Sequence, residues 1–139
     1  MSSVDKWYFK KGELSRADWD IHLDSQNPPV SGWKYTGLRV GTLVAGKTLD
    51  LPADTHERII FPLAGRDILV EYVSNNESKS QILSGRTSVF HGASDFIYLP
   101  INTSAKISGV GRIAVGETPA TTSKPVRYVA KSEVSITLR

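Results

Sequence analysis

Short runs of branched and aromatic residues alternate with clusters of turn-forming residues along most of the chain. Such runs are typical of β-strands, and clusters of Gly, Asn, Asp and Ser are typical of tight turns. The pattern predicts nine strands, over residues 38–44, 58–63, 68–73, 87–90, 96–99, 105–107, 112–115, 126–129 and 134–138. Only Ser15 to Asp18 has the spacing of a helix N-terminal cap, which predicts one short helical turn. We therefore expect an all-β domain of mostly antiparallel strands, a sandwich or barrel.

The last predicted strand alternates between apolar and hydroxyl-bearing residues. Val134, Ile136 and Leu138 share one face of it. Residues 118–125, rich in proline and hydroxyl side chains, are predicted to form an exposed linker before this strand. This strand should pack back on its own domain, pair with another copy of the chain, or lead into a further portion of protein. Residues 1–139 are expected to form a single domain.

Composition narrows the classes of function. The 139 residues include no cysteine, which excludes disulfides and thiolate metal sites. The net charge of +3 comes from scattered basic residues and not from the clustered patch of a nucleic-acid binder. Charged residues interrupt the N-terminus before any signal-peptide core, and the longest apolar run, residues 59–64, is far too short to span a membrane. We expect a cytoplasmic protein that binds neither nucleic acid nor membrane.

Two glycines bracket a segment with the outline of a metal-binding motif. Gly46 and Gly65 fit the first signature of the cupin superfamily, G-x5-H-x-H-x(3,4)-E-x6-G, and the segment resembles that superfamily of small double-sheet barrels. The two histidine positions of the signature fall on Pro52 and Asp54, and its glutamate position falls on Arg58, or on Glu57 only if the spacing is stretched. The turn residues are kept, but the imidazole ligands are absent.

The second cupin signature, G-x5-P-x-G-x2-H-x3-N, maps onto residues 94–109. Pro100 is in place, Asn102 takes the inner glycine position, Ala105 the histidine position and Gly109 the asparagine position. Glycine and proline serve backbone geometry, so a barrel can keep them without a metal. The resemblance implies a cupin-like double-stranded β-helix, also called a jelly-roll barrel.

An open divalent-metal site needs about three imidazoles with a carboxylate, or a similar set of nitrogen and oxygen ligands. The weak candidates for an improvised site are Asp54, His56, Glu57 and His91. No two histidines share a close spacing on one strand face, so we favour a polar turn at residues 54–57 and a loop position for His91. We expect no metal or other cofactor in this chain, and we assign no catalytic residue.

Three arginines are candidates for binding an anion. Arg39 alternates with Leu38 and Val40 on a predicted central strand, and an arginine that points into a barrel needs an anionic or carbonyl partner. The sequence leaves open whether Arg39 or its two neighbours face the core. If the barrel binds a sugar acid, then Arg39, Arg58 or Arg86 would hold the carboxylate.

The order of several motifs resembles a narrower family. KWYF (6–9), GWKYTGLRV (32–40), PLAG (62–65), GRTSVF (85–90) and DFIYLP (95–100) are similar to the N-terminal half of the 5-deoxy-glucuronate isomerases of the IolB type. The resemblance implies a two-cupin protein of twice this length, in which a divalent metal, zinc or manganese, is bound only by the C-terminal cupin. It also implies an aldose–ketose isomerisation of 5-deoxy-glucuronate to 5-dehydro-2-deoxy-gluconate in myo-inositol catabolism.

The leading hypothesis is therefore a metal-free N-terminal cupin domain of such an isomerase. Its role would be structural, and its partner would be the C-terminal cupin half or another copy of itself. The alternative hypothesis is a stand-alone, non-catalytic cupin that binds a sugar acid.

Overall fold

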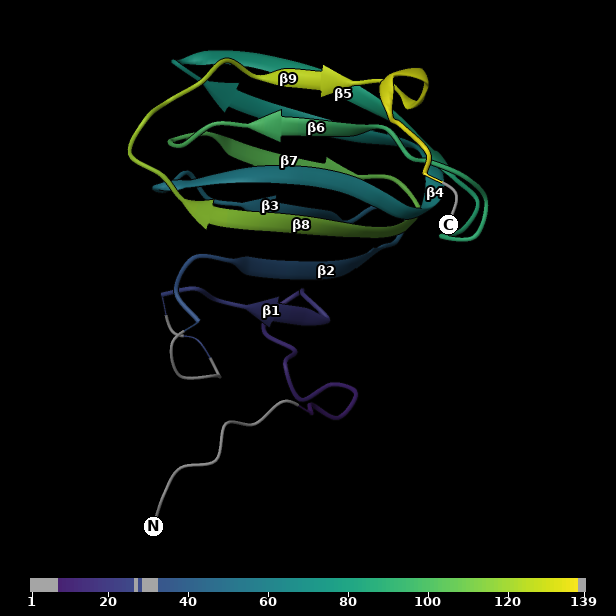
Figure 1. The fold of residues 1–139 in the computed structure, drawn as a ribbon, viewed down its shortest axis with the longest axis horizontal. Coiled ribbons are helices and arrows are strands. Elements are labelled where there is room, and N and C mark those ends of the chain that lie inside the picture. Colours follow the sequence, from purple (N-terminus) through teal and green to yellow (C-terminus); the bar gives the residue numbers. More distant parts are fainter. Residues whose placement is uncertain (1–7, 27, 29–32, 138–139) are drawn as a thin grey trace.

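The fold is a pair of antiparallel β-sheets packed face to face. The structure is a computed structural model that describes residues 8–26, 28 and 33–137. Its first sheet has the strand order β1-β2-β8-β4-β6-β9, and its second sheet has the order β3-β7-β4-β5. Figure 1 shows the first sheet with β1 and β9 at its two edges and the second sheet behind it. This arrangement confirms an all-β, mostly antiparallel, cupin-like jelly roll.

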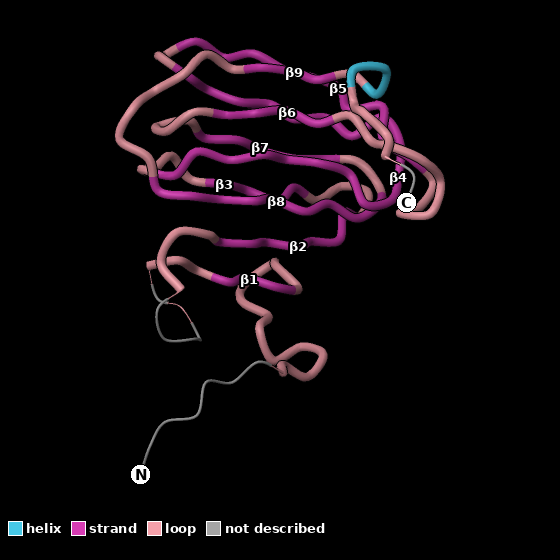
Figure 2. Tube along the Cα trace, in the orientation of Figure 1, coloured by secondary structure: helices cyan, strands magenta, loops and turns pink. Residues whose placement is uncertain are grey.

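The strands account for most of the described chain, as the tube in Figure 2 shows. A single 3-10 helical turn, Lys131–Glu133, follows the last strand of the described part. The strands are β1 (Ile21–Leu23), β2 (Gly37–Leu43), β3 (Thr48–Leu51), β4 (His56–Ser74), β5 (Glu77–Arg86), β6 (Phe96–Leu99), β7 (Ser104–Ser108), β8 (Gly111–Pro119) and β9 (Arg127–Val129).

The 19-residue strand β4 belongs to both sheets. Its first part pairs with β6 and β8, and its second part pairs with β5 and β7. The crossing lies at a bulge between Pro62 and Ala64, followed by Gly65 with a φ of +116°. Only glycine fits there, because a Cβ on Gly65 would lie 2.5 Å from the carbonyl oxygen of Val110. The close approach explains why this motif glycine is needed.

The hydrophobic core lies between the two sheets and is mainly aliphatic, with Trp19 and Tyr72 as its aromatic members. Alternate residues of each strand point into it, as the two-residue period of a pleated strand requires. The fully buried hydrophobic side chains include Leu51, Ile60, Ile68, Val70, Leu83, Ile97, Leu99, Ile107, Ile113 and Val115.

Several strand predictions are confirmed, and others need correction. The two predicted strands 58–63 and 68–73 are one continuous strand, because the residues at 65–67 bend the backbone without ending its pairing. The sequence pattern missed β1, β3 and β5, which are short or rich in polar residues. The first part of the predicted 118–125 linker, Thr118 and Pro119, extends β8.

Two predicted strands are wrong. Residues 87–90 form a turn, in which the His91 amide donates to the Ser88 carbonyl. Residues 134–137 form no strand, and Leu138 lies outside the described residues. Val134 is half-buried beside an apolar hollow on the first sheet, whereas Ile136, which also borders the hollow, is 72% exposed. The alternation over residues 134–137 is therefore not accompanied by backbone pairing.

The predicted helical turn at Ser15 to Asp18 is also absent. Arg16 and Trp19 exchange two backbone hydrogen bonds of 3.0 Å, which close a tight turn. Ala17 within this turn has a φ of +53°, which a helix does not allow.

Candidate functional site

Arg58 lies at the centre of a buried polar cluster between the two sheets. Its guanidinium donates to the Pro52 carbonyl at 2.8 Å, the Thr103 carbonyl at 3.4 Å and a carboxylate oxygen of Asp54 at 2.9 Å. Its Nε donates to Glu117 at 3.1 Å. Only 1% of the Arg58 side chain is exposed. The charge is buried and therefore depends on these partners.

Glu117 joins Arg58 to a second arginine, Arg39. Glu117 lies on β8 between the two strands that carry the arginines, in register with Gly37 on one side and with Arg58 on the other. Arg39 donates through Nε to the second carboxylate oxygen of Glu117, and its guanidinium lies 5.4 Å from the centre of the Trp19 ring. Arg39 thus faces inward, which settles the orientation that the sequence left open.

His56 borders the same cluster. Its Nε2 lies 3.2 Å from the Ser25 hydroxyl oxygen, and its Nδ1 lies 3.1 Å from Asp54 Oδ1 without hydrogen-bond geometry. A cavity of about 300 Å³ opens beside this histidine, and it is lined by His22, Arg39, His56, Glu117 and neighbouring residues. Burial lowers the pKa of His22, and the nearby Arg39 guanidinium lowers it further.

The ligand set of Asp54, His56 and Glu117 has the spacing of a metal site, because one ligand atom from each lies within 4.8 Å of the others. However, all four carboxylate oxygens already accept hydrogen bonds. Asp54 accepts from the His56 amide and from Arg58, and Glu117 accepts from Arg58 and from Arg39. Two guanidinium charges therefore balance the two carboxylates.

A divalent ion does not fit this arrangement of charges. An ion about 4 Å from one guanidinium would be repelled by roughly 8 kcal/mol at an effective dielectric constant of about 20. The ion would also have to displace hydrogen bonds to ionised groups, each of which is worth about 1.5–3 kcal/mol. Pro52 and Ala105, at two of the histidine positions of the cupin signatures, offer no side-chain ligand. The donors that are present fit an arginine-centred ion-pair network better than a metal centre.

Only two of the four weak metal candidates come together. Asp54 and His56 lie in the cluster, whereas Glu57 points to the opposite face of β4 and accepts a hydrogen bond of 2.6 Å from the Tyr98 hydroxyl. Burial and this contact raise the pKa of Tyr98 to about 12. His91 lies in the loop after β5, with its Nδ1 2.6 Å from the Ser88 hydroxyl oxygen.

The three candidate arginines do not form one clamp. Arg39 and Arg58 converge on Glu117, whereas Arg86 lies at the end of β5 and donates to the Gly92 carbonyl at 2.8 Å. The Nε of Arg86 is buried without a hydrogen-bond partner. Arg86 borders an apolar hollow of about 380 Å³. The hollow is also lined by Ile59, Phe61, Phe96, Val134 and Ile136.

Asp95 is a second buried acid, and sequence reasoning assigned it no role. It accepts hydrogen bonds from the backbone amides of Ser84 and Gly85, at 2.7 and 3.0 Å, and from the Tyr128 hydroxyl. Burial opposes its ionisation, but the hydrogen bonds outweigh burial and lower the pKa of Asp95. Asp95 therefore fastens β5 to the β9 edge. Its position within the DFIYLP motif was the available signal.

The outer face of the first sheet is unusually apolar. One row of paired residues across the strands consists of Leu38, Gly116, Ile59 and Tyr98, and a second consists of Val40, Ala114 and Phe61. These residues lie on the side of the sheet opposite Ile60 and Val115, which are fully buried in the core. Val40 and Ala114 are also buried, the others are half-buried, and Ile59 is exposed. A sheet face that meets water is normally polar. We call these two rows the apolar face.

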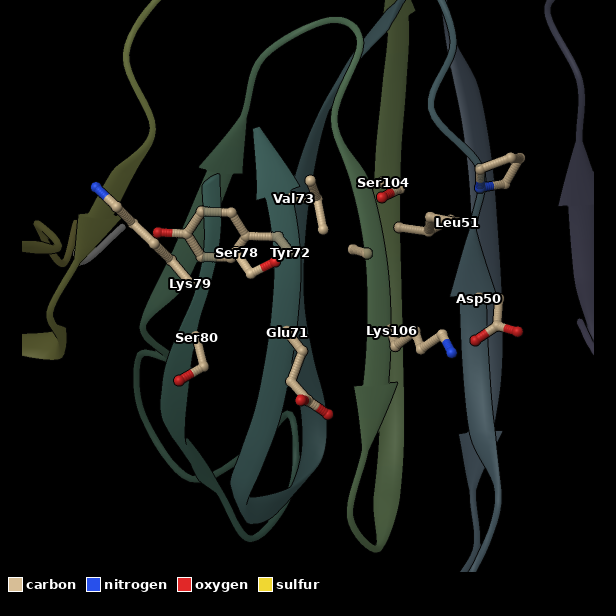
Figure 3. A pocket seen from close by; sticks show the side chains of 12 residues that line it. Asp50, Leu51, Glu71, Tyr72, Val73, Ser78, Lys79, Ser80, Ser104 and Lys106 are labelled. Carbon is tan, nitrogen blue, oxygen red and sulfur yellow. The ribbon is translucent and has the colours of Figure 1, made fainter. Parts of the chain in front are cut away.

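The outer face of the second sheet is different. Figure 3 shows Asp50, Lys106, Glu71 and Ser80 side by side across its four strands. This charged row is what a solvent-exposed sheet requires. The outer face of the second sheet also carries Val73 and Ile82, which are 41% and 56% exposed, but the charged row distinguishes it from the first.

Comparison with protein-family models matches residues 8–139 to one family, described as the KduI/IolB family. The chain belongs to the KduI/IolB family. The comparison confirms at family level the resemblance read from the sequence motifs. The comparison with curated proteins gave no match.

One solved structure carries a related name. The crystal structure of an IolB-like protein from Salmonella typhimurium LT2 is 30% identical over 90% of this chain, with a TM-score of 0.71. Only 46% of that protein is covered, so the chain spans about half its length. Vicilin from hazelnut, Corylus avellana, is 16% identical, with a TM-score of 0.45. The match covers 72% of this chain and 27% of the vicilin chain. A 7S globulin from Momordica charantia is 11% identical, with coverages of 70% and 33% and a TM-score of 0.34.

Within the described residues, no helix is both long and apolar enough to cross a bilayer.

Proposed function

We propose that this chain is the N-terminal, non-catalytic cupin half of a 5-deoxy-glucuronate isomerase. The whole enzyme would convert 5-deoxy-glucuronate to 5-dehydro-2-deoxy-gluconate in myo-inositol catabolism. The divalent metal, zinc or manganese, and the catalytic groups would belong to the C-terminal cupin. Support comes from the family match and from a polar cluster in which every carboxylate oxygen is already bonded.

The observation that carries the structural role is the apolar face. Ile59 at its centre is 41% exposed, and Phe61 and Phe96 line the neighbouring hollow. Covering this face would remove apolar surface from water, which stabilises an interface by about 25 cal/mol for each Å² buried. We assign the covering partner as the second cupin half, because the similar Salmonella protein has more than half its length beyond the matched region. The charged outer face of the second sheet would remain in water.

An activity assay tests the division of roles. The chain should show no isomerase activity by itself, with or without added zinc or manganese. Activity should appear when the C-terminal cupin half is supplied. Turnover by the chain alone would refute the non-catalytic assignment.

A matched pair of variants tests the interface. Ile59 and Val73 are both 41% exposed, but they lie on the outer faces of different sheets. Ile59→Lys should abolish association with the C-terminal half in analytical ultracentrifugation, whereas Val73→Lys should leave it intact. Equal effects of the two substitutions would contradict the assignment of the apolar face. Self-association of the chain that Ile59→Lys abolishes would identify a second copy as the occupant instead.

Binding of a sugar acid is a second candidate function, favoured by the cavity of about 300 Å³ beside Arg39. The Arg39 guanidinium would meet the carboxylate, and the neutral form of His22, favoured by its lowered pKa, would offer a donor and an acceptor to hydroxyl groups. Calorimetric titration with glucuronate tests this function. Saturable binding that Arg39→Gln removes and Arg86→Gln retains would support it, and absence of heat would count against it.

A further inference from the structure

We infer that the guanidinium of Arg58 is the resident cation of this barrel and takes the structural place of a divalent metal ion. The inference depends on the geometry of the Arg58 cluster and not on the proposed function. It goes beyond the absence of imidazole ligands, because it assigns the role of the missing ion to a particular side chain.

The first argument is the set of atoms around Arg58. Four oxygen atoms, two from carboxylates and two from backbone carbonyls, accept from its guanidinium at 2.8 to 3.4 Å. Carboxylate and carbonyl oxygens are the ligands that hard cations prefer. The guanidinium meets them with a fixed planar fork, which a lysine ammonium cannot reproduce.

The second argument is connectivity. The four oxygens come from three separate parts of the chain, which are the turn at residues 52–54, Thr103 before β7, and Glu117 on β8. Arg58 itself lies on β4 and is in register with Leu99 and Glu117. One buried cation therefore joins the segments of both cupin signatures, as a bound metal would. A backbone bond from Asn102 to the Asp54 carbonyl, at 2.7 Å, joins the same two segments beside it.

The third argument is what would remain without the charge. Asp54, His56 and Glu117 already hold ligand atoms within 4.8 Å of one another, and His56 Nδ1 is buried without a hydrogen-bond partner. Arg58 bonds both carboxylates, neutralises them together with Arg39, and repels a second cation. Once the charge is removed, two carboxylates and one imidazole remain, a ligand set that suits Zn²⁺ or Co²⁺. The guanidinium thus excludes the metal whose role it takes.

The experiment compares Arg58→Gln with Arg58→Lys in the full chain. Both substitutions remove the planar fork, but only Arg58→Gln removes the charge. Calorimetric titration with Zn²⁺, and Co²⁺ absorption spectra, should show one ion per chain in Arg58→Gln. Its affinity should be at least 100-fold higher than that of the wild type or of Arg58→Lys. A further His56→Ala change should abolish this binding, whereas His91→Ala should not.

Three results would overturn the inference. The first is stoichiometric zinc in the wild-type barrel, and the second is equal zinc affinity in the two Arg58 variants. The third concerns folding. If Arg58→Gln is unfolded without metal, then zinc should restore its far-ultraviolet circular dichroism. A variant that stays unfolded with zinc would show that a metal ion cannot replace the guanidinium. None of these measurements involves isomerase activity or the second half, so failure here is separate from failure of the proposed function.

Discussion

Replacing Glu117 with glutamine should be among the most damaging conservative changes in this chain. The Glu117 side chain is 5% exposed and is bonded to two guanidinium groups, of which Arg58 is 1% and Arg39 is 11% exposed. In the wild type, two arginines balance Glu117 and Asp54. Glu117→Gln removes the carboxylate that Arg39 bonds and leaves Arg58 bonded to Asp54, so the buried cluster gains a net positive charge.

The expected cost is about 3–5 kcal/mol of the free energy of unfolding, the usual range when one partner of a buried ion pair is removed. The amide oxygen of the new glutamine can still accept from one arginine, which favours the lower part of this range. The free energy of unfolding of a typical domain is only about 5–15 kcal/mol, so a loss of this size should be easy to measure. Urea unfolding followed by tryptophan fluorescence and circular dichroism measures it.

Glu57→Gln is the matched control. Glu57 lies on the outer face of β4, where it accepts a hydrogen bond from the Tyr98 hydroxyl. A glutamine oxygen can accept the same bond, so the loss should stay below about 1 kcal/mol. In a double-mutant cycle, Arg39→Gln should cost less in the Glu117→Gln background than in the wild type. If Glu117→Gln costs no more than Glu57→Gln, then the ion-pair network does not have the energetic role described here.

Two further predictions concern other parts of the fold. The pKa of Asp95 is lowered from 3.8, so its stabilising contribution is present above that value and is lost as the pH falls through the lower, folded-state pKa. The unfolding free energy of the wild type should therefore decrease more steeply below about pH 5 than that of Asp95→Asn, and parallel pH profiles would contradict this. Gly65→Ala should cost about 2–4 kcal/mol, since it combines a positive φ with a Cβ only 2.5 Å from a carbonyl oxygen. Gly46→Ala, also at positive φ but with open space, should cost about 1 kcal/mol, and equal losses in urea titrations would show that the close contact is unimportant.

Much of the fold could be predicted because a strand has a recognisable pattern in its own few residues. Alternating branched residues and the turns between them correctly indicated β2, β6, β7, β8 and β9. β5 escaped prediction because most of its exposed residues are serine and lysine, which are common in loops. The strand predicted at 134–138 was wrong because apolar and polar residues also alternate in segments that do not pair with a strand, as residues 134–137 show.

The candidate site was only partly predictable. Arg39, Asp54, His56 and Arg58 were all singled out, yet nothing in the sequence joined them. The missing member was Glu117, which lies 59 residues from Arg58 and 78 from Arg39. A lone glutamate on a strand gives no local signal of its partners.

The sequence by itself determined the strand content, the turn glycines, the lack of thiols and the motif order that marks the KduI/IolB family. Each of these features depends on residue identity and on the order of residues along the chain. Only the tertiary structure decided that Arg39 faces inward, that Glu57 faces outward, and that a single arginine joins the segments of both cupin signatures. The reason is register. A shift of one residue between β8 and its neighbours would exchange the inner and outer faces, and no local pattern in the chain fixes that pairing.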